Sequence, residues 1–296
     1  MTREEKKSIY MQAIREYLNA DEKDQSLTKF ADKYGLKRQT MSKYMKEMGY
    51  EIINHQNKCR IDETVFDEID TEEKAYWLGF LMADGNIGNN EHKLEMNLAA
   101  KDWEHMKKFQ DFLHYTNPEV RIREQYGRGT EQCRFSIRNL HIWSALNNKG
   151  CTPKKSLTLV FPDLSIFKTQ NLVRHFIRGY WDGDGSLGIY PVNGNPDRLI
   201  EEVSVVGTES FLTSVACILG HPNIKPYSKG EYNKAFKLSF SSLTARKIMR
   251  YLYEGATIYL DRKYEIYKKS CQLEEESSRK KSSKIGEDCD VNTEVN

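Results

Sequence analysis

The sequence predicts an α+β protein in which two pseudo-symmetric αββαββα halves follow a small all-α module. Three observations predict this fold. First, a short apolar segment runs into an Asp-Gly pair twice, at 77–85 (WLGFLMADG) and at 177–185 (IRGYWDGDG). Second, the same order of helical and strand-like periodicities follows each copy, which indicates an internal repeat. Third, the first fifty residues carry a helical pattern of their own.

Length and composition limit the classes of protein that need to be considered. The 296 residues allow about two domains with a sizeable core. The net charge is +2, but acids outnumber bases after position 271, so the preceding chain is more basic and suits a polyanionic partner. The six cysteines form no CxxC pair, which argues against a zinc knuckle or a disulfide framework. No apolar run could span a bilayer, so we expect a soluble intracellular protein.

Residues 1–50 are predicted to form a helix-turn-helix-like DNA-binding module. A helical apolar stripe covers 3–18, and within 27–46 Ala31 falls in a short helix and Gly35 at the turn that follows it. An ordinary three-helix cluster with a solvated basic face is the alternative. In a helix-turn-helix module, the start and exposed face of the second helix would hold the side chains that contact the major groove, namely Lys37, Arg38, Gln39, Thr40 and Lys43.

The remaining chain is divided by its periodicity into a linker, two halves and a tail. We expect a linker over 51–71, a first half over 72–164, a second half over 165–271 and a flexible charged tail over 272–296. The first half is predicted to have helices over 72–84, 102–114 and 140–148, and strands over 86–87, 93–99, 120–126 and 132–138. The second is predicted to have helices over 169–184, 209–219 and 243–253, and strands over 186–191, 199–207, 224–228 and 235–241.

The two apolar segments each have one face without side-chain bulk. Gly79 is followed four positions later by Ala83, and Gly179 is followed by Gly183. Two such faces can pack backbone to backbone, as small-xxx-small helices do. This packing would bring the terminal carboxylates of Asp84 and Asp184 together, where two acids can share metal ions. The pair therefore predicts an interface and an active site at once.

The predicted strands alternate between an apolar face and a polar face. A solvated sheet face is the ordinary explanation of such a pattern. Here, however, the polar face is rich in the side chains that reach base edges and phosphates, which favours a nucleic-acid surface. The candidate DNA-contacting residues are Lys93, Asn97, Arg121, Arg123, Gln125, Gln132, Arg134 and Arg138 in the first half, and Lys225, Tyr227, Lys229, Lys237 and Ser239 in the second.

The two Asp-Gly segments resemble the paired motifs of single-chain LAGLIDADG, or dodecapeptide, homing endonucleases. Further segments are similar to this family, including KGCTPKKSLTLVFP after the first half and YLYEGATIYLDRKY in the second. The resemblance covers about two thirds of the chain, and two correctly spaced copies, each opening an αββαββα unit, make it specific. It implies that the sheets form a saddle over the DNA major groove and that the carboxylates of Asp84 and Asp184 hold divalent metal ions at the scissile phosphates.

The activity implied by the resemblance is a staggered double-strand break with short 3′ overhangs in a long DNA target. Metal ions held by a few carboxylates can activate water, neutralise the phosphate and stabilise the leaving oxygen. Mg²⁺ needs only one or two protein carboxylates, so one aspartate from each half suffices; Mn²⁺ is the expected substitute. The protein is then a monomer with internal pseudo-twofold symmetry, either intron-encoded or free-standing.

Two lysines are candidates for a supporting catalytic role. Lys155 lies in TPKKS at the end of the first half, and Lys263 lies in LDRKY at the corresponding place in the second. In the family that the chain resembles, a lysine from this region is near the scissile phosphate and its water, where it orients solvent and stabilises charge. Phosphate positioning or a surface location is the alternative role. Lys154 and Arg262 are the adjacent candidates if the register differs by one.

The two motifs differ at one acidic position. Met82 occupies the place that Asp182 has in the second copy. Because the final aspartate of each motif is the expected metal ligand, Met82 should alter packing more than chemistry. A non-cleaving regulator on the same fold, or a maturase that binds intron RNA, is the rival interpretation of the chain.

Overall fold

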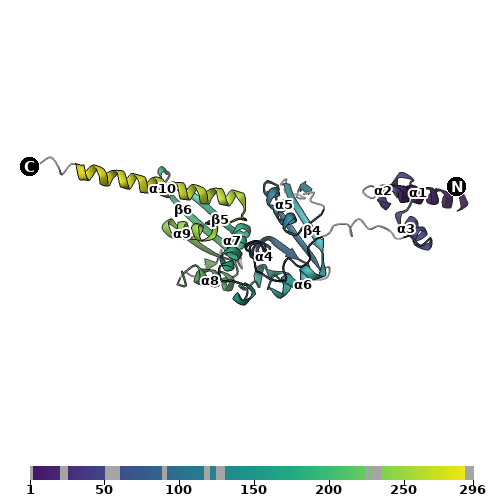
Figure 1. The fold of residues 1–296 in the computed structure, drawn as a ribbon, viewed down its shortest axis with the longest axis horizontal. Coiled ribbons are helices and arrows are strands. Elements are labelled where there is room, and N and C mark those ends of the chain that lie inside the picture. Colours follow the sequence, from purple (N-terminus) through teal and green to yellow (C-terminus); the bar gives the residue numbers. More distant parts are fainter. Residues whose placement is uncertain are drawn as a thin grey trace, which may run out of the picture. The chain divides into compact units, whose positions relative to one another are not determined.

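The computed structural model of the chain describes residues 3–20, 26–50, 61–88, 92–116, 121–124, 131–223, 227–228 and 235–290. The chain divides into two compact units, one N-terminal and one that begins at Asp62. Figure 1 shows their helices and strands, coloured along the sequence from purple to yellow. Each unit has buried apolar residues of its own.

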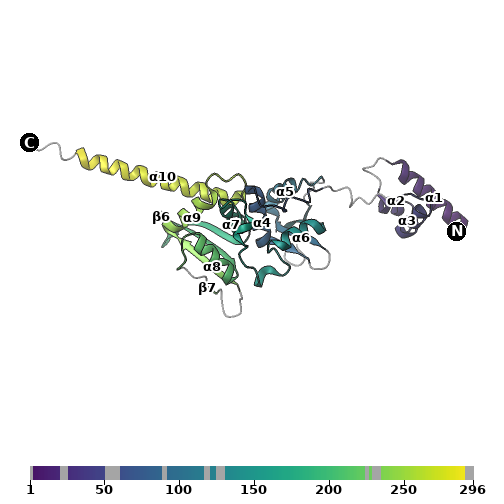
Figure 2. The same cartoon turned by 60° about the horizontal axis from the view of Figure 1, so that its bottom comes forward.

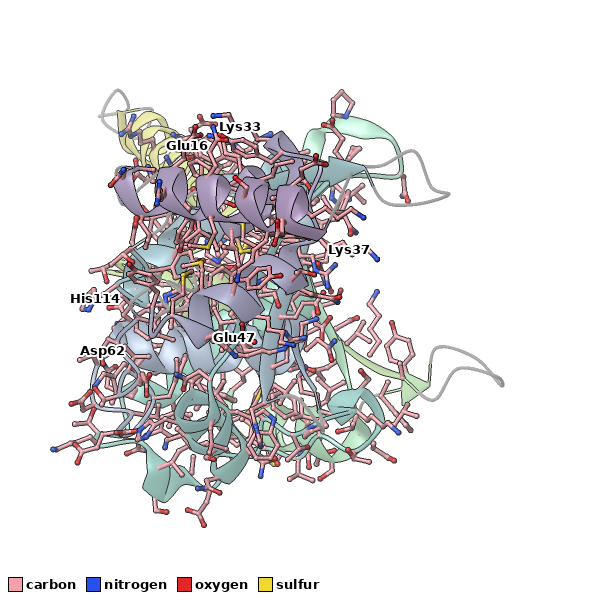
Figure 3. All side chains as sticks on the ribbon, turned by 90° about the vertical axis from the view of Figure 1, so that its right-hand side faces the viewer. Glu16, Lys33, Lys37, Glu47, Asp62 and His114 are labelled. Carbon is pink, nitrogen blue, oxygen red and sulfur yellow. The ribbon has the colours of Figure 1, made fainter. Side chains whose placement is uncertain are left out.

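The N-terminal unit contains α1 (Arg3–Asn19), α2 (Leu27–Lys33) and α3 (Arg38–Glu47). The Ser26 hydroxyl caps α2 by accepting the Lys29 N–H at 3.3 Å. Gly35 turns the chain between α2 and α3 with φ +61°, a conformation that favours glycine. On the surface, Glu16 and Lys33 form an ion pair of 2.6 Å that joins α1 to α2 (Figure 3). The buried core consists of Ala13, Ile14, Tyr17, Leu27, Ala31, Met41 and Met45.

The second unit contains two four-stranded antiparallel sheets in the part of the chain that the structure describes. Their strand orders are β1-β2-β4-β3 and β5-β6-β8-β7, so the second sheet repeats the first. The predicted α+β fold with two pseudo-symmetric halves is thereby confirmed. The strands are β1 (Gly85–Ile87), β2 (Lys93–Ala99), β3 (Arg121–Glu124), β4 (Glu131–Arg138), β5 (Gly185–Val192), β6 (Asn195–Gly207), β7 (Tyr227–Ser228) and β8 (Phe236–Ser241).

Helices cover one face of each sheet and leave the other face to polar side chains. Helix α5 packs against β2 and β4, while α8 and α9 pack against β6 and β8. Helices α4 and α7 lie side by side between the two sheets (Figure 2). The helices of this unit are α4 (Glu72–Asp84), α5 (Trp103–Phe112), α6 (Leu140–Asn148), α7 (Leu172–Asp184), α8 (Glu209–Ile218), α9 (Ser242–Tyr253) and α10 (Asp261–Asp290).

The second part of the linker expected over 51–71 belongs to the folded unit, which begins at Asp62, while 51–60 lie outside the described residues. Val65, Phe66 and Ile69 are buried, and the Phe66 ring packs against Phe112 of α5. Ile69 also forms a parallel bridge with Phe167 in the segment between the halves. Weak periodicity concealed this segment, since its apolar residues contact α5 and the segment between the halves without forming one regular helical or strand face.

The flexible tail expected from residue 272 is also different in the structure. Helix α10 begins at Asp261 and continues to Asp290. The mixed charges of this segment do not oppose a helix, because acids and bases three or four positions apart can pair on its surface. Arg279, for example, lies 3.7 Å from Glu275. None of the helices in the described ranges is both long and apolar enough to cross a membrane.

Candidate active site at the paired helix ends

Helices α4 and α7 cross with their backbones in direct contact. A Cβ atom at Gly79 would overlap the carbonyl oxygen of Phe176, and one at Gly179 would overlap the carbonyl oxygen of Tyr76. Any larger side chain at either glycine would therefore force the helices apart. The predicted backbone-to-backbone packing is confirmed, and it explains why each helix needs glycine at this position.

The same crossing brings the C-terminal ends of the two helices together. A Cβ atom at Gly183 would overlap the Cβ of Ala83 and would lie 3.4 Å from a carboxylate oxygen of Asp84. Both helices end at their aspartate, and Gly85 and Gly185 continue directly into β1 and β5. The side chains of Asp84 and Asp184 therefore leave adjoining helix ends.

The two carboxylates affect each other's protonation. They are exposed to solvent, yet the pKa of Asp84 is raised to about 6, first by the protein atoms that crowd it and then by the negative charge of Asp184. Crowding also raises the pKa of Asp184, while Lys155, Lys263 and the Tyr180 hydroxyl counteract this effect. Two acids that resist simultaneous ionisation form a site that a cation would stabilise.

The donor set at the helix ends suits a hard divalent cation. Both side chains offer oxygen atoms, and Mg²⁺ is commonly bound by one or two carboxylates together with waters. The described residues contain no group of three or more His, Cys, Asp and Glu side chains able to hold a metal ion. At this site, Asp84 and Asp184 are the residues whose side-chain oxygen atoms could hold such an ion.

Lys155 and Lys263 lie at the two helix ends, but their ammonium groups bond to the backbone. Lys263 is 2% exposed, and its Nζ donates at 2.7 Å to each of the carbonyl oxygens of Trp181, Asp182 and Gly185. Lys155 is likewise buried and donates to the carbonyl of Gly85. A helix leaves its last carbonyls without partners, and a cation there is favourable. Both lysines thus fix the backbone from which the carboxylates project.

The neighbouring candidates in sequence lie elsewhere. Lys154 is exposed, with a left-handed backbone conformation of φ +58°. Arg262 pairs with Asp102, its Nε lying 3.1 Å from a carboxylate oxygen. The structure therefore places Lys155 and Lys263, rather than Lys154 and Arg262, at corresponding sites in the two halves.

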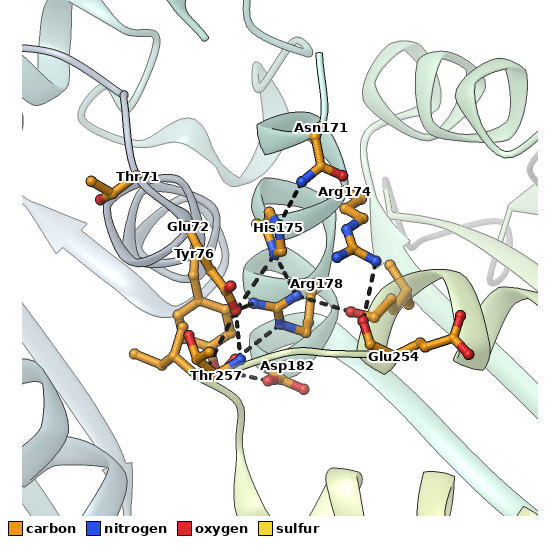
Figure 4. Close-up of polar contacts among 12 residues, drawn as sticks. Thr71, Glu72, Tyr76, Asn171, Arg174, His175, Arg178, Asp182, Glu254 and Thr257 are labelled. Carbon is orange, nitrogen blue, oxygen red and sulfur yellow. Dashed lines mark hydrogen bonds and ion pairs between the residues drawn. The ribbon is translucent and has the colours of Figure 1, made fainter. Parts of the chain in front are cut away.

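A buried polar network, which the motif comparison did not anticipate, supports the second helix (Figure 4). Asp182 accepts hydrogen bonds from the Tyr76 hydroxyl at 2.7 Å, the Leu260 N–H at 2.8 Å and the Tyr253 hydroxyl at 2.5 Å. Asp182 therefore serves as an acceptor inside the protein. Its bond from Tyr76 of α4 also joins the two halves.

Arg178 extends this network one helical turn earlier. Its guanidinium donates to Glu72 of α4 at 2.7 Å and to the carbonyls of Leu252 and Ile258 at 2.9 Å. Arg178 and Asp182 stand four residues apart in an otherwise largely apolar motif, where the first copy has Leu78 and Met82. That spacing was the available sequence signal, because two charges on one face of a buried helix need partners.

The predicted DNA-contacting side chains of the body fall on the polar faces of the two sheets wherever they are described. The residues with described side chains are Lys93, Asn97, Gln132, Arg134 and Arg138 on the first sheet and Tyr227, Lys237 and Ser239 on the second. Arg121 and Arg123 pair through their backbones with Arg134 and Gln132. Gln125, Lys225 and Lys229 lie outside the described residues.

In the N-terminal unit, the predicted reader side chains lie on and just before α3. Arg38, Gln39 and Lys43 are exposed, and Thr40 is half-buried. Lys37 precedes the helix, and its N–H donates to the Tyr10 hydroxyl of α1 at 3.2 Å. The exposure of these groups leaves them accessible to a partner, and their binding to DNA stays a prediction.

Comparison with known proteins gives the following similarities. No protein-family model matches the sequence, and no curated protein matches it significantly. Solved structures of LAGLIDADG homing endonucleases are similar to the chain over most of its length. The endonuclease I-GzeII, solved in complex with its DNA target, is 13% identical, with a TM-score of 0.45 and coverage of 75% of this chain and 98% of that one.

Two further endonucleases of the family give similar values. I-LtrWI, solved bound to target DNA, is 12% identical with a TM-score of 0.45, and the match covers 76% of this chain and 99% of that one. I-AabMI, solved bound to uncleaved DNA, is 11% identical with a TM-score of 0.44, covering 75% and 98% of the two chains.

Proposed function

We propose that the protein is a site-specific DNA endonuclease that depends on a divalent metal ion, Mg²⁺ in the first place. The observation that carries this proposal is the pair of carboxylates, Asp84 and Asp184, held at adjoining helix ends between two sheets with polar outer faces. A backbone-to-backbone crossing is needed for this placement, and Gly79 and Gly179 supply it. An acid pair of this kind fits metal-assisted phosphodiester hydrolysis.

In the proposed reaction the protein side chains bind the metal ion, hold the helix ends in position and balance the charge of the carboxylates. A bound divalent ion supplies an activated water and neutralises charge on the phosphate. Asp84 and Asp184 hold it, and Lys155 and Lys263 keep both helix ends in place through their bonds to backbone carbonyls. The positive charges of these lysines also favour the ionised carboxylates. We propose that each half serves one strand, giving a staggered double-strand break.

The sheets would provide the specificity of binding. Their polar faces carry Arg, Lys, Gln and Asn in the first half and Lys, Ser and Tyr in the second, which include the donors that read base edges in the major groove. The exposed Arg38, Gln39 and Lys43 of α3 would add a second DNA contact through the N-terminal unit. Because the two units are joined in one chain, such a contact would increase the effective concentration of one at the site of the other.

The direct test uses a DNA target selected from random duplexes by binding to the full-length protein without Mg²⁺. A supercoiled plasmid carrying this target should be linearised when Mg²⁺ is added, and EDTA should prevent the reaction. A plasmid with a scrambled target is the matched control. Tight, sequence-specific binding without cleavage in Mg²⁺ or Mn²⁺ would overturn the nuclease proposal and indicate a regulator. Selective binding of intron RNA instead of the duplex would indicate a maturase.

A further inference from the structure

The polar face of the first sheet is built around one acidic side chain, Glu95. This residue lies in the middle of β2 and pairs with Asn86 of β1 on one side and Ser136 of β4 on the other. Lys93 and Asn97 share its face on the same strand, because side chains two positions apart point the same way. Arg134 pairs with Asn97 and shares that face from β4.

Glu95 binds the three nitrogen-bearing side chains around it. It accepts from Lys93 Nζ at 2.6 Å and from Asn97 Nδ2 at 3.3 Å, and a guanidinium nitrogen of Arg134 forms a close ion pair with it. The Glu95 side chain is only 10% exposed, whereas that of Arg134 is 49% exposed. Burial raises the pKa of Glu95, but the bonds from Lys93 and Asn97 lower it by more, so the carboxylate is ionised at neutral pH.

The second sheet has no such acid at the equivalent place. Ser204 pairs with Ser186 and Ser239 there, as Glu95 pairs with Asn86 and Ser136. By the same register, Lys237 stands where the first sheet has Arg134. The other equivalent positions hold Val206 in place of Asn97, Glu202 in place of Lys93 and Ser241 in place of Arg138. The two sheets therefore have the same strand pairing, but the carboxylate that binds the basic side chains of the first face is absent at the equivalent position of the second.

A carboxylate behind an arginine changes what the arginine can recognise. A guanidinium has five N–H donors in a planar fork, so one edge can bind Glu95 while the other stays available to a base. Orientation is essential for a two-bond contact with the O6 and N7 atoms of guanine. An Arg or Lys side chain that no acid holds in place can turn to phosphate oxygens instead of base edges. Contacts with phosphates carry no direct sequence information.

We propose that Glu95 is a specificity-determining positioning residue of the first half, which holds Arg134 and Lys93 so that they read purine edges, guanine foremost, instead of phosphates. This proposal rests on the proposed binding of duplex DNA but not on cleavage. The negative charge of Glu95 also lowers by one the net positive charge of the face that would meet the DNA. It thereby weakens the attraction to any sequence while improving discrimination between sequences.

The test compares the sequence preferences of the full-length protein and of Glu95→Gln. Each protein selects from a random duplex library in EDTA, so that no cleavage occurs, and the bound sequences give a base-preference profile. We expect Glu95→Gln to lose about tenfold in discrimination for guanine at one or two adjacent positions of one half-site. The affinity of Glu95→Gln for non-specific duplex should rise. The slope of its log binding constant against log salt concentration should steepen by about the amount expected for one more phosphate contact.

Glu202→Gln is the matched control, because it removes the same charge from the equivalent face of the second sheet. Glu202 is exposed, and its substitution should increase non-specific affinity without changing the base preferences of the first half-site. Thermal unfolding of both variants checks that the fold is intact. Glu95→Asp, which keeps the charge, should recover part of the guanine preference.

The outcomes separate this inference from the proposed function. A wild-type protein with a defined target and an unchanged profile in Glu95→Gln would overturn the role of Glu95 and leave the endonuclease proposal standing. A wild-type protein without any sequence preference would contradict both. Equal loss of preference across both half-sites in Glu95→Gln would also overturn the inference, since it would show a general effect of charge.

Discussion

The two halves of the body have the same backbone plan but support their carboxylates with different chemistry. In both, a 13-residue helix with a central glycine ends at an aspartate, and a buried lysine binds the carbonyl of the glycine that follows. In the first half, the apolar side chains of Met82 and Leu78 stand on α4 and are buried. In the second half, Asp182 and Arg178 occupy the equivalent places and bind polar partners.

This difference separates what the site requires from what it tolerates. The two helices agree where the backbone approach and the terminal carboxylate demand a particular residue, as at Gly79 and Gly179. They differ where only a filled volume is required, which either an apolar side chain or a fully hydrogen-bonded polar one can provide. The polar side chain of Asp182 also accepts a hydrogen bond from Tyr76 of the opposite half, so it fixes how the two helices meet.

The largest expected effect comes from the helix crossing that both halves share. Gly79→Ala or Gly179→Ala should destabilise the protein by about 3 kcal/mol or more, because the new Cβ would overlap a backbone carbonyl that cannot move without separating the helices. Thermal or denaturant unfolding measures the change. Gly88→Ala is the control: its Cβ would lie 3.4 Å from the Lys93 Cβ. A similar loss in all three variants would contradict the proposed packing.

The next effect should separate the two halves. Asp182→Asn replaces a buried acceptor of three hydrogen bonds with an amide that must turn its NH₂ toward donors, so we expect a loss of about 2 to 3 kcal/mol. Met82→Leu exchanges one buried apolar side chain for another of similar volume and should cost below about 1 kcal/mol. Urea unfolding of both variants provides the comparison. Equal costs would mean that the polar network of the second half contributes no more than apolar packing does.

The two capping lysines should differ by a smaller amount. Lys263→Met leaves three carbonyls without their donor and should cost about 2 kcal/mol, whereas Lys155→Met leaves the Gly85 carbonyl and should cost about 1 kcal/mol. The ranking is measured by unfolding at pH 7. If Lys155→Met proved the more damaging, the assignment of the stronger cap to the second half would be wrong.

The contribution of Lys263 to stability should depend on pH. Burial lowers the pKa of Lys263 to about 8, with the charge of Asp182 opposing the shift. Because this folded-state pKa lies below the unfolded value of about 10.5, burying the charged ammonium offsets part of what its hydrogen bonds contribute, so the net stability from Lys263 is smallest below pH 8 and rises as the pH increases from 8 to 10.5. The difference in stability between the wild type and Lys263→Met should therefore change between pH 7 and 10.5. A constant difference would contradict the shift.

Much of the fold could be predicted from sequence because local patterns determine it. The helices ending at Asp84 and Asp184 and the alternating strand at Lys93–Ala99 were visible as periodicities within one element. The N-terminal helices were visible in the same way. The segment around Phe66 was misassigned because its packing depends on partners far away in sequence.

The site was predictable to a similar extent. The juxtaposition of the carboxylates followed from the small residues at Gly79 and Gly179. The binding partners of Lys155 and Lys263 did not, since a lysine that faces a phosphate and one that caps a helix have the same sequence signature. The partners of Asp182 lie on three separate segments, so no spacing within one motif could reveal them.

The central claim is that Asp84 and Asp184 together form a metal-dependent cleavage site rather than two structural helix ends. The most direct measurement compares Asp84→Asn and Asp184→Asn with the wild type on the selected target, recording double-strand cleavage in Mg²⁺ and binding in EDTA. Either substitution should abolish double-strand cleavage while changing the affinity for the target by less than about threefold. Loss of binding in proportion to cleavage, or cleavage at the wild-type rate in either variant, would contradict the account.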